Sequence, residues 1–135
     1  MTPQLKLKKE TMKLRYTMVL AATAVGLLTA CSPSPEGTVE MFYHAVEKND
    51  DEAALKLIHP VSVQMMGVSK FRASFAKQRG RFEKCGGIKA ITVDMKGTAD
   101  RKAGPAEVSF KGECKPQRDN LQMTKVDGTW YIGGL

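Results

Sequence analysis

The sequence has few of the residues from which catalytic and metal sites are usually built. It contains only two histidines, His44 and His59, and neither has a second histidine or a cysteine at the spacing of a metal site. It has no Gly-x-Ser-x-Gly motif, no phosphate-binding loop and no dinucleotide-binding glycine motif. None of its three cysteines forms a Cys-x-x-Cys pair, which argues against a thiol redox enzyme. The sequence therefore predicts no metal, no cofactor and no catalytic centre of these kinds.

The N-terminal segment has the order of features that an export signal has. Basic residues come first, and an apolar stretch follows at residues 16–28. A permanent membrane helix needs about 20 apolar residues, so this stretch is too short to span a bilayer comfortably. No second apolar stretch of that length follows. We interpret residues 1–30 as a cleaved signal peptide, within which Met12 is an alternative start.

The end of this segment, Leu28-Thr29-Ala30-Cys31, resembles the lipobox of bacterial lipoproteins. The resemblance implies that the Cys31 sulfur receives a diacylglyceryl group, that cleavage occurs before Cys31 and that the new amine is acylated. Each acyl methylene buried in the bilayer contributes about 0.8 kcal/mol, so two or three chains would anchor the protein firmly. An ordinary secretory signal with an incidental cysteine is the alternative. In enteric-type bacteria, Ser32 after the cysteine favours the outer membrane.

The positive net charge does not indicate a nucleic-acid-binding protein. The 135 residues carry a formal net charge of +7, of which residues 1–30 contribute +4 and the rest only +3. A charge that lies mostly in a removed leader says little about the mature chain. We expect residues 31–37, rich in Pro and Ser, to be a tether, and residues 38–135 to form one folded domain.

Apolar spacing predicts three helices in the first half of the domain. Residues 38–48 carry an apolar stripe with helical spacing, formed by Val39, Phe42, Tyr43 and Val46. A second short helix is predicted from Asn49, as N-cap with Glu52 at N3, to about His59, because Pro60 prevents its continuation. Residues 61–66 fit either a strand or an irregular connection. A third helix, capped by Ser69, is predicted over residues 70–84, with a core stripe of Phe71, Phe75, Gln78 and Phe82.

The spacing of apolar residues changes to two after Gly86-Gly87, which predicts strands. Apolar and polar residues alternate over residues 91–95 and 106–114, and again from 121. Asp127-Gly128 between alternating runs predicts a two-residue hairpin, with Lys125 opposite Trp130 and Met123 opposite Ile132. The expected fold is α+β, with N-terminal helices packed on an antiparallel sheet of three to four strands.

Four stretches of the chain resemble one group of small bacterial lipoproteins. They are residues 34–46 (SPEGTVEMFYHAV), 48–54 (KNDDEAA), 86–88 (GGI) and 126–130 (VDGTW). They are similar to the nuclear-transport-factor-2-like (cystatin-like) superfamily, in particular to the group called domain of unknown function 4878. The resemblance covers roughly residues 34–133. It implies a curved sheet wrapped against a long helix, forming a cone that can hold a pocket.

Cys85 and Cys114 remain once Cys31 is assigned to lipidation. In the oxidising environment of an exported domain, an even pair predicts a disulfide, which would stabilise by about 3.5 kcal/mol through closure of a loop of about 30 residues. Two free buried thiols or a redox site are the alternatives.

Candidate site residues are few. Some relatives by fold are isomerases and dehydratases with an Asp, Tyr or His inside the cone, and the conceivable equivalents here are Tyr43, Asp94 and Tyr131. The sequence shows no second titratable group placed to shift the pKa of Tyr43 or Asp94, so we expect no enzyme. His44 is expected to be solvated, and His59 to lie in the last turn of the second helix.

One side of the third predicted helix is basic. It carries Lys70, Lys77, Arg81 and Lys84, which could meet an anionic lipid or an acidic envelope partner, or form only a solvated face. The leading hypothesis is a non-catalytic lipoprotein of the cell envelope, anchored at the outer membrane on its periplasmic side or surface, whose domain binds a ligand or partner. A small isomerase- or hydrolase-like enzyme and a structural envelope-assembly protein are the alternatives.

Overall fold

The computed structural model describes residues 32–134. The predicted signal peptide, its cleavage site at Leu28-Thr29-Ala30 and the lipidation site Cys31 lie outside this range. The non-helical tether is shorter than the predicted residues 31–37, because helix α2 (Pro35–Glu47) begins at Pro35. The Ser34 Oγ accepts a hydrogen bond from the Gly37 amide at 3.0 Å, and Pro35 occupies the first helical turn, where its missing amide hydrogen costs nothing.

Helix α2 presents the predicted apolar stripe to the core. Val39, Tyr43 and Val46 are fully buried, and Phe42 packs partly buried beside them. The helix ends before Asn49, which has a positive φ of 61°. That left-handed backbone conformation is one that Asn adopts more readily than most residues, so it suits the turn into the next helix.

The segment between α2 and the long helix contains two short helices, where the sequence predicts only one. Helix α3 (Asp51–Lys56) is capped by Asp50, whose Oδ1 accepts from the Ala53 amide at 3.1 Å, so Asn49 is not its N-cap. Residues 61–66 are neither strand nor irregular: they belong to helix α4 (Pro60–Met66). His59 therefore lies at the start of α4 and not in the last turn of α3, since Pro60 begins a helix as readily as it stops one.

Helix α5 (Val68–Lys84) is the predicted long helix, and it starts two residues early. Its N-cap is Gly67, with no side-chain hydrogen bond, so Ser69 does not cap it. Phe75 and Phe82 are buried while Phe71 and Gln78 are half-buried, as the predicted stripe requires. Gly86 and Gly87 follow with positive φ and turn the chain into the sheet.

The sheet is antiparallel throughout. Its strands are β1 (Ile88–Val93), β2 (Lys96–Gly97), β3 (Arg101–Phe110), β4 (Gln117–Val126) and β5 (Thr129–Ile132). The order is β1-β3-β4-β5, with the two-residue β2 pairing to β3, which adds one strand to the expected number. The hairpin register is confirmed, because Lys125 pairs with Trp130 and Met123 with Ile132.

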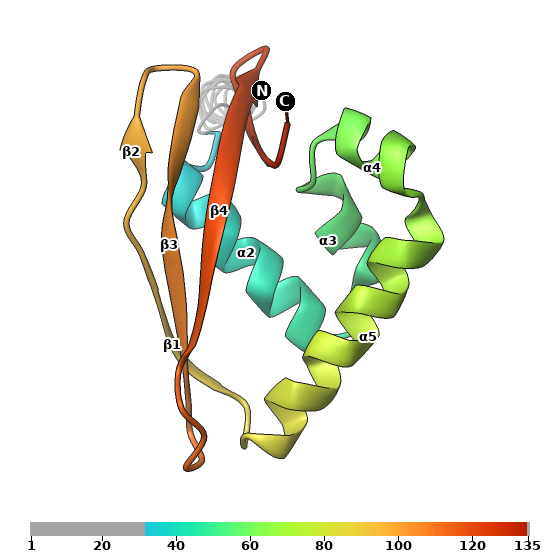
Figure 1. The fold of residues 1–135 in the computed structure, drawn as a ribbon, viewed down its shortest axis with the longest axis vertical. Helices are drawn as coiled ribbons and strands as arrows, with labels where there is room; N and C mark the ends of the chain where they lie inside the picture. Colours follow the sequence, from blue (N-terminus) through green and yellow to red (C-terminus); the bar gives the residue numbers. More distant parts are fainter. Residues whose placement is uncertain (1–31, 135) are drawn as a thin grey trace, which may run out of the picture. The chain divides into compact units, whose positions relative to one another are not determined.

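Helices and sheet form the two layers that the sequence predicts. Helix α2 crosses the inner face of the sheet, and α5 stands across from β4 (Figure 1). The buried cluster between the layers includes Tyr43, Phe82, Val108 and Met123. The α+β fold with N-terminal helices on a curled antiparallel sheet is thus confirmed.

A disulfide ties the end of α5 to the loop between β3 and β4. Cys85 and Cys114 are bonded, with their Cα atoms 5.4 Å apart, which is the pairing that the sequence predicts. The Gly112 amide also donates to the Cys85 carbonyl at 2.9 Å, so backbone hydrogen bonding holds the same two segments together.

Candidate functional site

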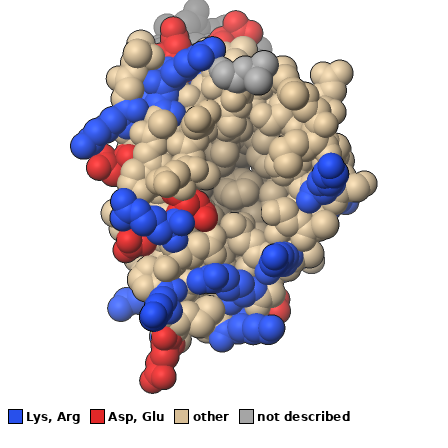
Figure 2. Space-filling view, in the orientation of Figure 1, with Lys and Arg blue, Asp and Glu red and all other residues tan. Residues whose placement is uncertain are grey.

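A cavity of about 530 Å³ opens between α5, α2 and β4. Figure 2 shows the face of the molecule hollowed near its centre. Helices α2, α4 and α5, strands β4 and β5, and two residues just outside these elements line it: Phe42, Tyr43, Ile58, Ser62, Met66, Phe71, Ser74, Phe75, Gln78, Arg118, Asp119, Asn120, Leu121, Ile132 and Gly133. Its volume lies in the range of small-molecule sites, about 300–1,000 Å³.

The pocket is open because β5 is short. β5 pairs only with residues 123–126 of β4, so the first half of β4 has no strand on that side among residues 32–134. Helix α5 faces this half of β4 (Figure 1), and residues of both elements line the cavity. The four-residue length of β5 thus decides where the cone is accessible.

Three phenylalanines form part of the pocket wall. Phe42 and Phe75 meet edge to face with ring centroids 5.6 Å apart, and Phe71 packs against Phe75 at 6.2 Å. These rings come from α2 and α5 and fill only part of the space between the helices and the sheet. They offer a ligand an apolar surface with aromatic edges and faces.

One end of the pocket carries a polar pair. The buried Tyr43 hydroxyl donates a hydrogen bond to Asp119 Oδ2 at 2.6 Å, and Gln117 Nε2 donates to the same oxygen at 2.8 Å. Burial raises the pKa of Tyr43 above its ordinary value of 10.0, and the hydrogen bond to the Asp119 carboxylate raises this pKa further. Tyr43 consequently stays a hydrogen-bond donor at any physiological pH.

The other carboxylate oxygen, Asp119 Oδ1, has no hydrogen-bond partner among the described residues. No fully buried polar side-chain atom in residues 32–134 lacks a partner, so this unpaired oxygen is at least partly accessible. The nearby Arg118 projects to Glu107 of β3, with 3.8 Å between Nη1 and Oε2, and so has a partner of its own. Asp119 therefore offers one free acceptor oxygen at the polar end of the pocket.

The three residues considered from the sequence are not brought together. Tyr43 lines the pocket, but Asp94 is exposed with its Oδ2 3.8 Å from the Lys96 ammonium, and Tyr131 packs on the His59 ring at 5.9 Å outside the pocket. The expectation that Tyr43 lacks a titratable neighbour is wrong, because Asp119 contacts it. Asp119 follows the alternation of Leu121 and Met123 on β4, and a carboxylate at an inward position was the available signal.

The histidines take no part in the pocket. His44 is half exposed, with its Nδ1 4.0 Å from Glu47 Oε1, as expected for a solvated residue. His59 Nδ1 accepts a hydrogen bond from the Val61 amide at 3.2 Å, so it acts as an N-cap rather than as a cation at a helix C-terminus. That hydrogen bond needs an unprotonated Nδ1.

The part of the chain that the structure describes contains neither a cluster of metal-ligating side chains nor a membrane-spanning helix. Within residues 32–134, no three His, Cys, Asp or Glu side chains gather as metal ligands would. None of the helices in the same range is long and apolar enough to cross a membrane.

The comparisons with known proteins bear on the fold alone. No family model matches the chain, and neither does any curated protein. Solved structures do match, and one is a Campylobacter jejuni protein provisionally described as an NTF2-like transpeptidase. It is 18% identical, with a TM-score of 0.66, and the match covers 73% of this chain and 96% of that one. The nuclear-transport-factor-2-like fold is thereby confirmed, whereas the resemblance to the 4878 lipoprotein group stays a prediction.

Proposed function

We propose that this protein is an envelope lipoprotein whose domain binds a small amphipathic molecule in the pocket beside α5, without catalysing a reaction. The ligand would have an apolar body that fits against Phe42, Phe71 and Phe75, and a hydrogen-bond donor or cationic head that meets Asp119. A cone with a pocket is the feature that the confirmed fold brings to this proposal.

The observation that carries the proposal is the free oxygen of Asp119. Its other oxygen already accepts from Tyr43 and Gln117, which fixes the orientation of the carboxylate. A carboxylate held in one orientation at the end of an apolar pocket is preorganised for a donor such as a primary ammonium group. Hydrogen bonds between charged groups are about twice as strong as those between neutral ones, so this contact would select the head group.

Binding is favoured over reaction by the chemistry of the lining. Tyr43 is held as a donor, and its raised pKa opposes a role as base. The structural neighbour is described as a transpeptidase. Acyl transfer of that type needs a nucleophile activated by a base. The hydroxyls that line the pocket, other than that of Tyr43, belong to Ser62 and Ser74, and no Cys, His or Lys lines it with them. An enzyme is therefore the weaker proposal.

Two aromatic probes of nearly equal size and opposite head charge test this site. Phenethylamine carries an ammonium head and phenylacetate a carboxylate, and both can be titrated into residues 32–135 by calorimetry. We expect phenethylamine to bind and phenylacetate not to. Asp119→Asn should weaken phenethylamine binding about tenfold or more, because a charge-assisted hydrogen bond contributes about 1.5–3 kcal/mol.

Asp94→Asn is the matched control, since it removes an equal charge at an exposed position outside the pocket. It should leave phenethylamine binding unchanged. Equal binding of the two probes, or an equal effect of the two Asn variants, would show that Asp119 does not select the ligand and would end this part of the proposal.

The anchor is tested separately on the full chain. Metabolic labelling with palmitate should mark the protein, and Cys31→Ser should remove the label and release the protein from membranes washed at about 0.5 M salt, which removes proteins held only by charge. Retention of Cys31→Ser on washed membranes, or an unchanged label, would contradict the lipoprotein proposal without affecting the pocket.

A further inference from the structure

The basic side chains of α5 fall into two sets, and the structure shows how they differ in their partners. Arg79 Nη2 lies 2.6 Å from Asp51 Oδ1, and Arg79 Nε donates to the Val46 carbonyl at 3.0 Å. Arg72 forms an ion pair with Glu52. These two arginines fasten α5 to α3 and to the end of α2, and their charges are compensated.

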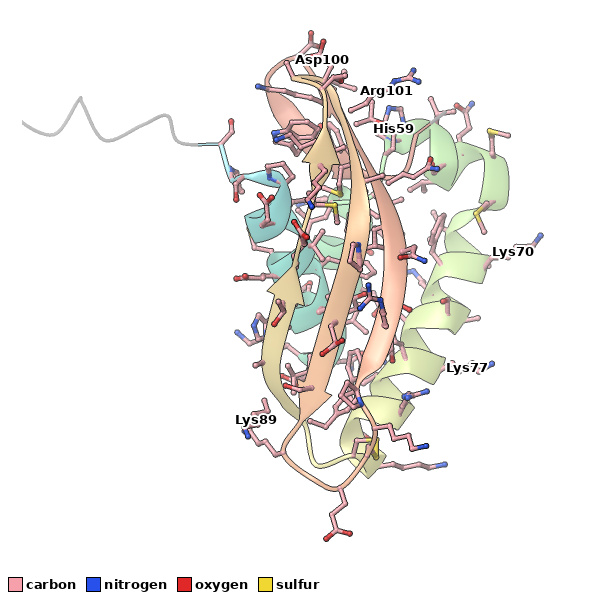
Figure 3. All side chains as sticks on the ribbon, turned by 60° about the vertical axis from the view of Figure 1, so that its left-hand side comes forward. His59, Lys70, Lys77, Lys89, Asp100 and Arg101 are labelled. Carbon is pink, nitrogen blue, oxygen red and sulfur yellow. A yellow bond between two sulfur atoms is a disulfide. The ribbon has the colours of Figure 1, made fainter. Side chains whose placement is uncertain are left out.

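The other set, by contrast, has no acidic partner. Among the described residues, no carboxylate lies within ion-pair distance of the four side chains predicted as a possible anionic-partner surface: Lys70, Lys77, Arg81 and Lys84. All four are exposed. Lys70 and Lys77 point outward on the same side of α5, away from the sheet (Figure 3). Positions seven apart on a helix lie about 10 Å apart along it, so the charges form a stripe.

The stripe continues beyond the helix. Lys115, next to the disulfide, lies with Arg81 and Lys84 around a shallow hollow at the end of α5. The disulfide between Cys85 and Cys114 thus holds a loop lysine beside the helix cations. Glu83, the single acidic residue of α5, lies on a different side of the helix from Lys70 and Lys77.

Uncovered apolar side chains precede the stripe at its other end. Helix α4 has no buried residue. Met65 is 71% exposed, Met66 53% and Val68 43%. Val68, two residues before Lys70, lies on nearly the opposite side of α5 from it and is not part of the stripe. Helix α4 ends at Met66 and α5 begins at Val68, so the exposed methionines immediately precede the first turn of α5, which carries Lys70. We call Met65, Met66, Lys70, Lys77, Arg81 and Lys84 the α4–α5 face.

We propose that the α4–α5 face docks on an anionic lipid bilayer. Met65 and Met66 would enter the headgroup layer, while the Lys and Arg side chains pair with lipid phosphates. Apolar side chains beside a basic stripe are the combination that holds interfacial helices on membranes. A fluid bilayer suits lysine, whose ammonium is a mobile point charge, better than a rigid protein surface does. The docking does not depend on the Cys31 anchor, and Met66 is the one residue of the face that also lines the pocket.

The unit tested is residues 32–135, which holds the whole buried core and the disulfide. Its sedimentation with phosphatidylcholine vesicles is compared with and without about 30% phosphatidylglycerol, at about 0.05 M and 0.5 M salt. We expect binding to the anionic vesicles at low salt, weak binding to the neutral ones, and loss of binding at high salt. Each cation near an anionic surface contributes about 1 kcal/mol, which is about fivefold in affinity. The pair Lys70→Gln and Lys77→Gln should therefore weaken binding about 25-fold.

Matched variants separate the face from general charge. Lys89→Gln with Lys96→Gln removes the same charge from β1 and β2, and Lys89 lies away from α5 in Figure 3. This pair should change binding by no more than about twofold. Met65→Ser with Met66→Ser should weaken it about tenfold, whereas Met41→Ser, at a position 48% exposed on α2, should not.

Three results would overturn the proposal. They are no binding to anionic vesicles at low salt, equal binding to neutral vesicles, and an equal loss in the Lys89 and Lys96 control pair. The first of these, combined with salt-dependent capture of an acidic envelope protein that requires Lys70 and Lys77, would assign the face to a protein partner instead.

Discussion

Replacing Tyr43 by phenylalanine removes one oxygen atom from the pocket and leaves the aromatic packing of α2 in place. The Tyr43 ring lies 5.5 Å from the Phe42 ring and 6.4 Å from the Phe82 ring, and a phenylalanine keeps both contacts. What is lost is the hydrogen bond of 2.6 Å to Asp119. Tyr43→Phe therefore tests that bond with little disturbance of the core.

The expected magnitude follows from the surroundings of Asp119. A hydrogen bond to a charged group contributes about 1.5–3 kcal/mol, and less when water can replace the missing partner. Asp119 is half-buried, lines an open pocket and keeps its hydrogen bond from the Gln117 amide. We therefore take the lower end of this energy range. We expect Tyr43→Phe to lower the free energy of unfolding by about 1.5–2 kcal/mol, or the melting temperature by roughly 10 °C.

Urea denaturation of residues 32–135 measures this free energy. A double-mutant cycle with Asp119→Ala should give a coupling of about 1.5 kcal/mol between the two side chains. Tyr131→Phe is the control, because the Tyr131 hydroxyl has no hydrogen-bond partner among the described residues and its loss should cost less than about 0.5 kcal/mol. The reasoning is refuted if Tyr43→Phe lowers the free energy of unfolding no more than Tyr131→Phe does, or if the coupling energy is close to zero. Either result would mean that the hydrogen bond between Tyr43 and Asp119 does not stabilise the fold.

Three further predictions concern the same unit. Replacing Cys85 and Cys114 by serine should lower the free energy of unfolding by about 3.5 kcal/mol, since the bond closes a loop with a sequence separation of 29, and thiol labelling of the unreduced, denatured unit should find no free thiol. Gly80→Ala should raise the free energy of unfolding by about 0.5–1 kcal/mol, because a Cβ at this helical position meets nothing within 4 Å; no gain in urea midpoint would contradict this. The raised pKa of Tyr43 in the folded state means that its contribution to stability is complete below the unfolded tyrosine pKa of about 10 and declines as pH rises above it. The advantage of the parent over Tyr43→Phe should accordingly shrink in urea titrations above pH 10, and a constant difference would refute the assignment.

The sequence by itself determined the elements whose causes are local. The stripe of Val39, Tyr43 and Val46 predicts one helix and the phenylalanine stripe predicts another, because burial of one face requires helical spacing. Asp127-Gly128 predicts the hairpin and its register, because Asp-Gly favours a two-residue turn and the length of the turn fixes which residues pair. The two remaining cysteines predict their own pairing, given an oxidising compartment. The helices and the hairpin depend on residues a few positions apart, and the disulfide follows from the number of cysteines that remain in the domain.

Short helices were the least predictable local elements. Asn49 and Asp50 are both good N-caps, and the chain uses Asp50 because Asn49 takes the left-handed conformation of the turn. Pro60 is compatible with the end of one helix and the start of the next. The stretch after Pro60 is too short for apolar spacing to distinguish a helix from a strand.

Tertiary structure alone brought the polar residues of the pocket together. Tyr43 and Asp119 are separated by 76 positions in the chain, and they meet only because β4 passes the middle of α2. Helical spacing had grouped Lys70, Lys77, Arg81 and Lys84 on one side of α5, but only the structure shows that acidic residues of α3 compensate the other two basic residues, Arg72 and Arg79. Long-range contacts of this kind depend on how whole elements pack, which no local pattern of residue types encodes.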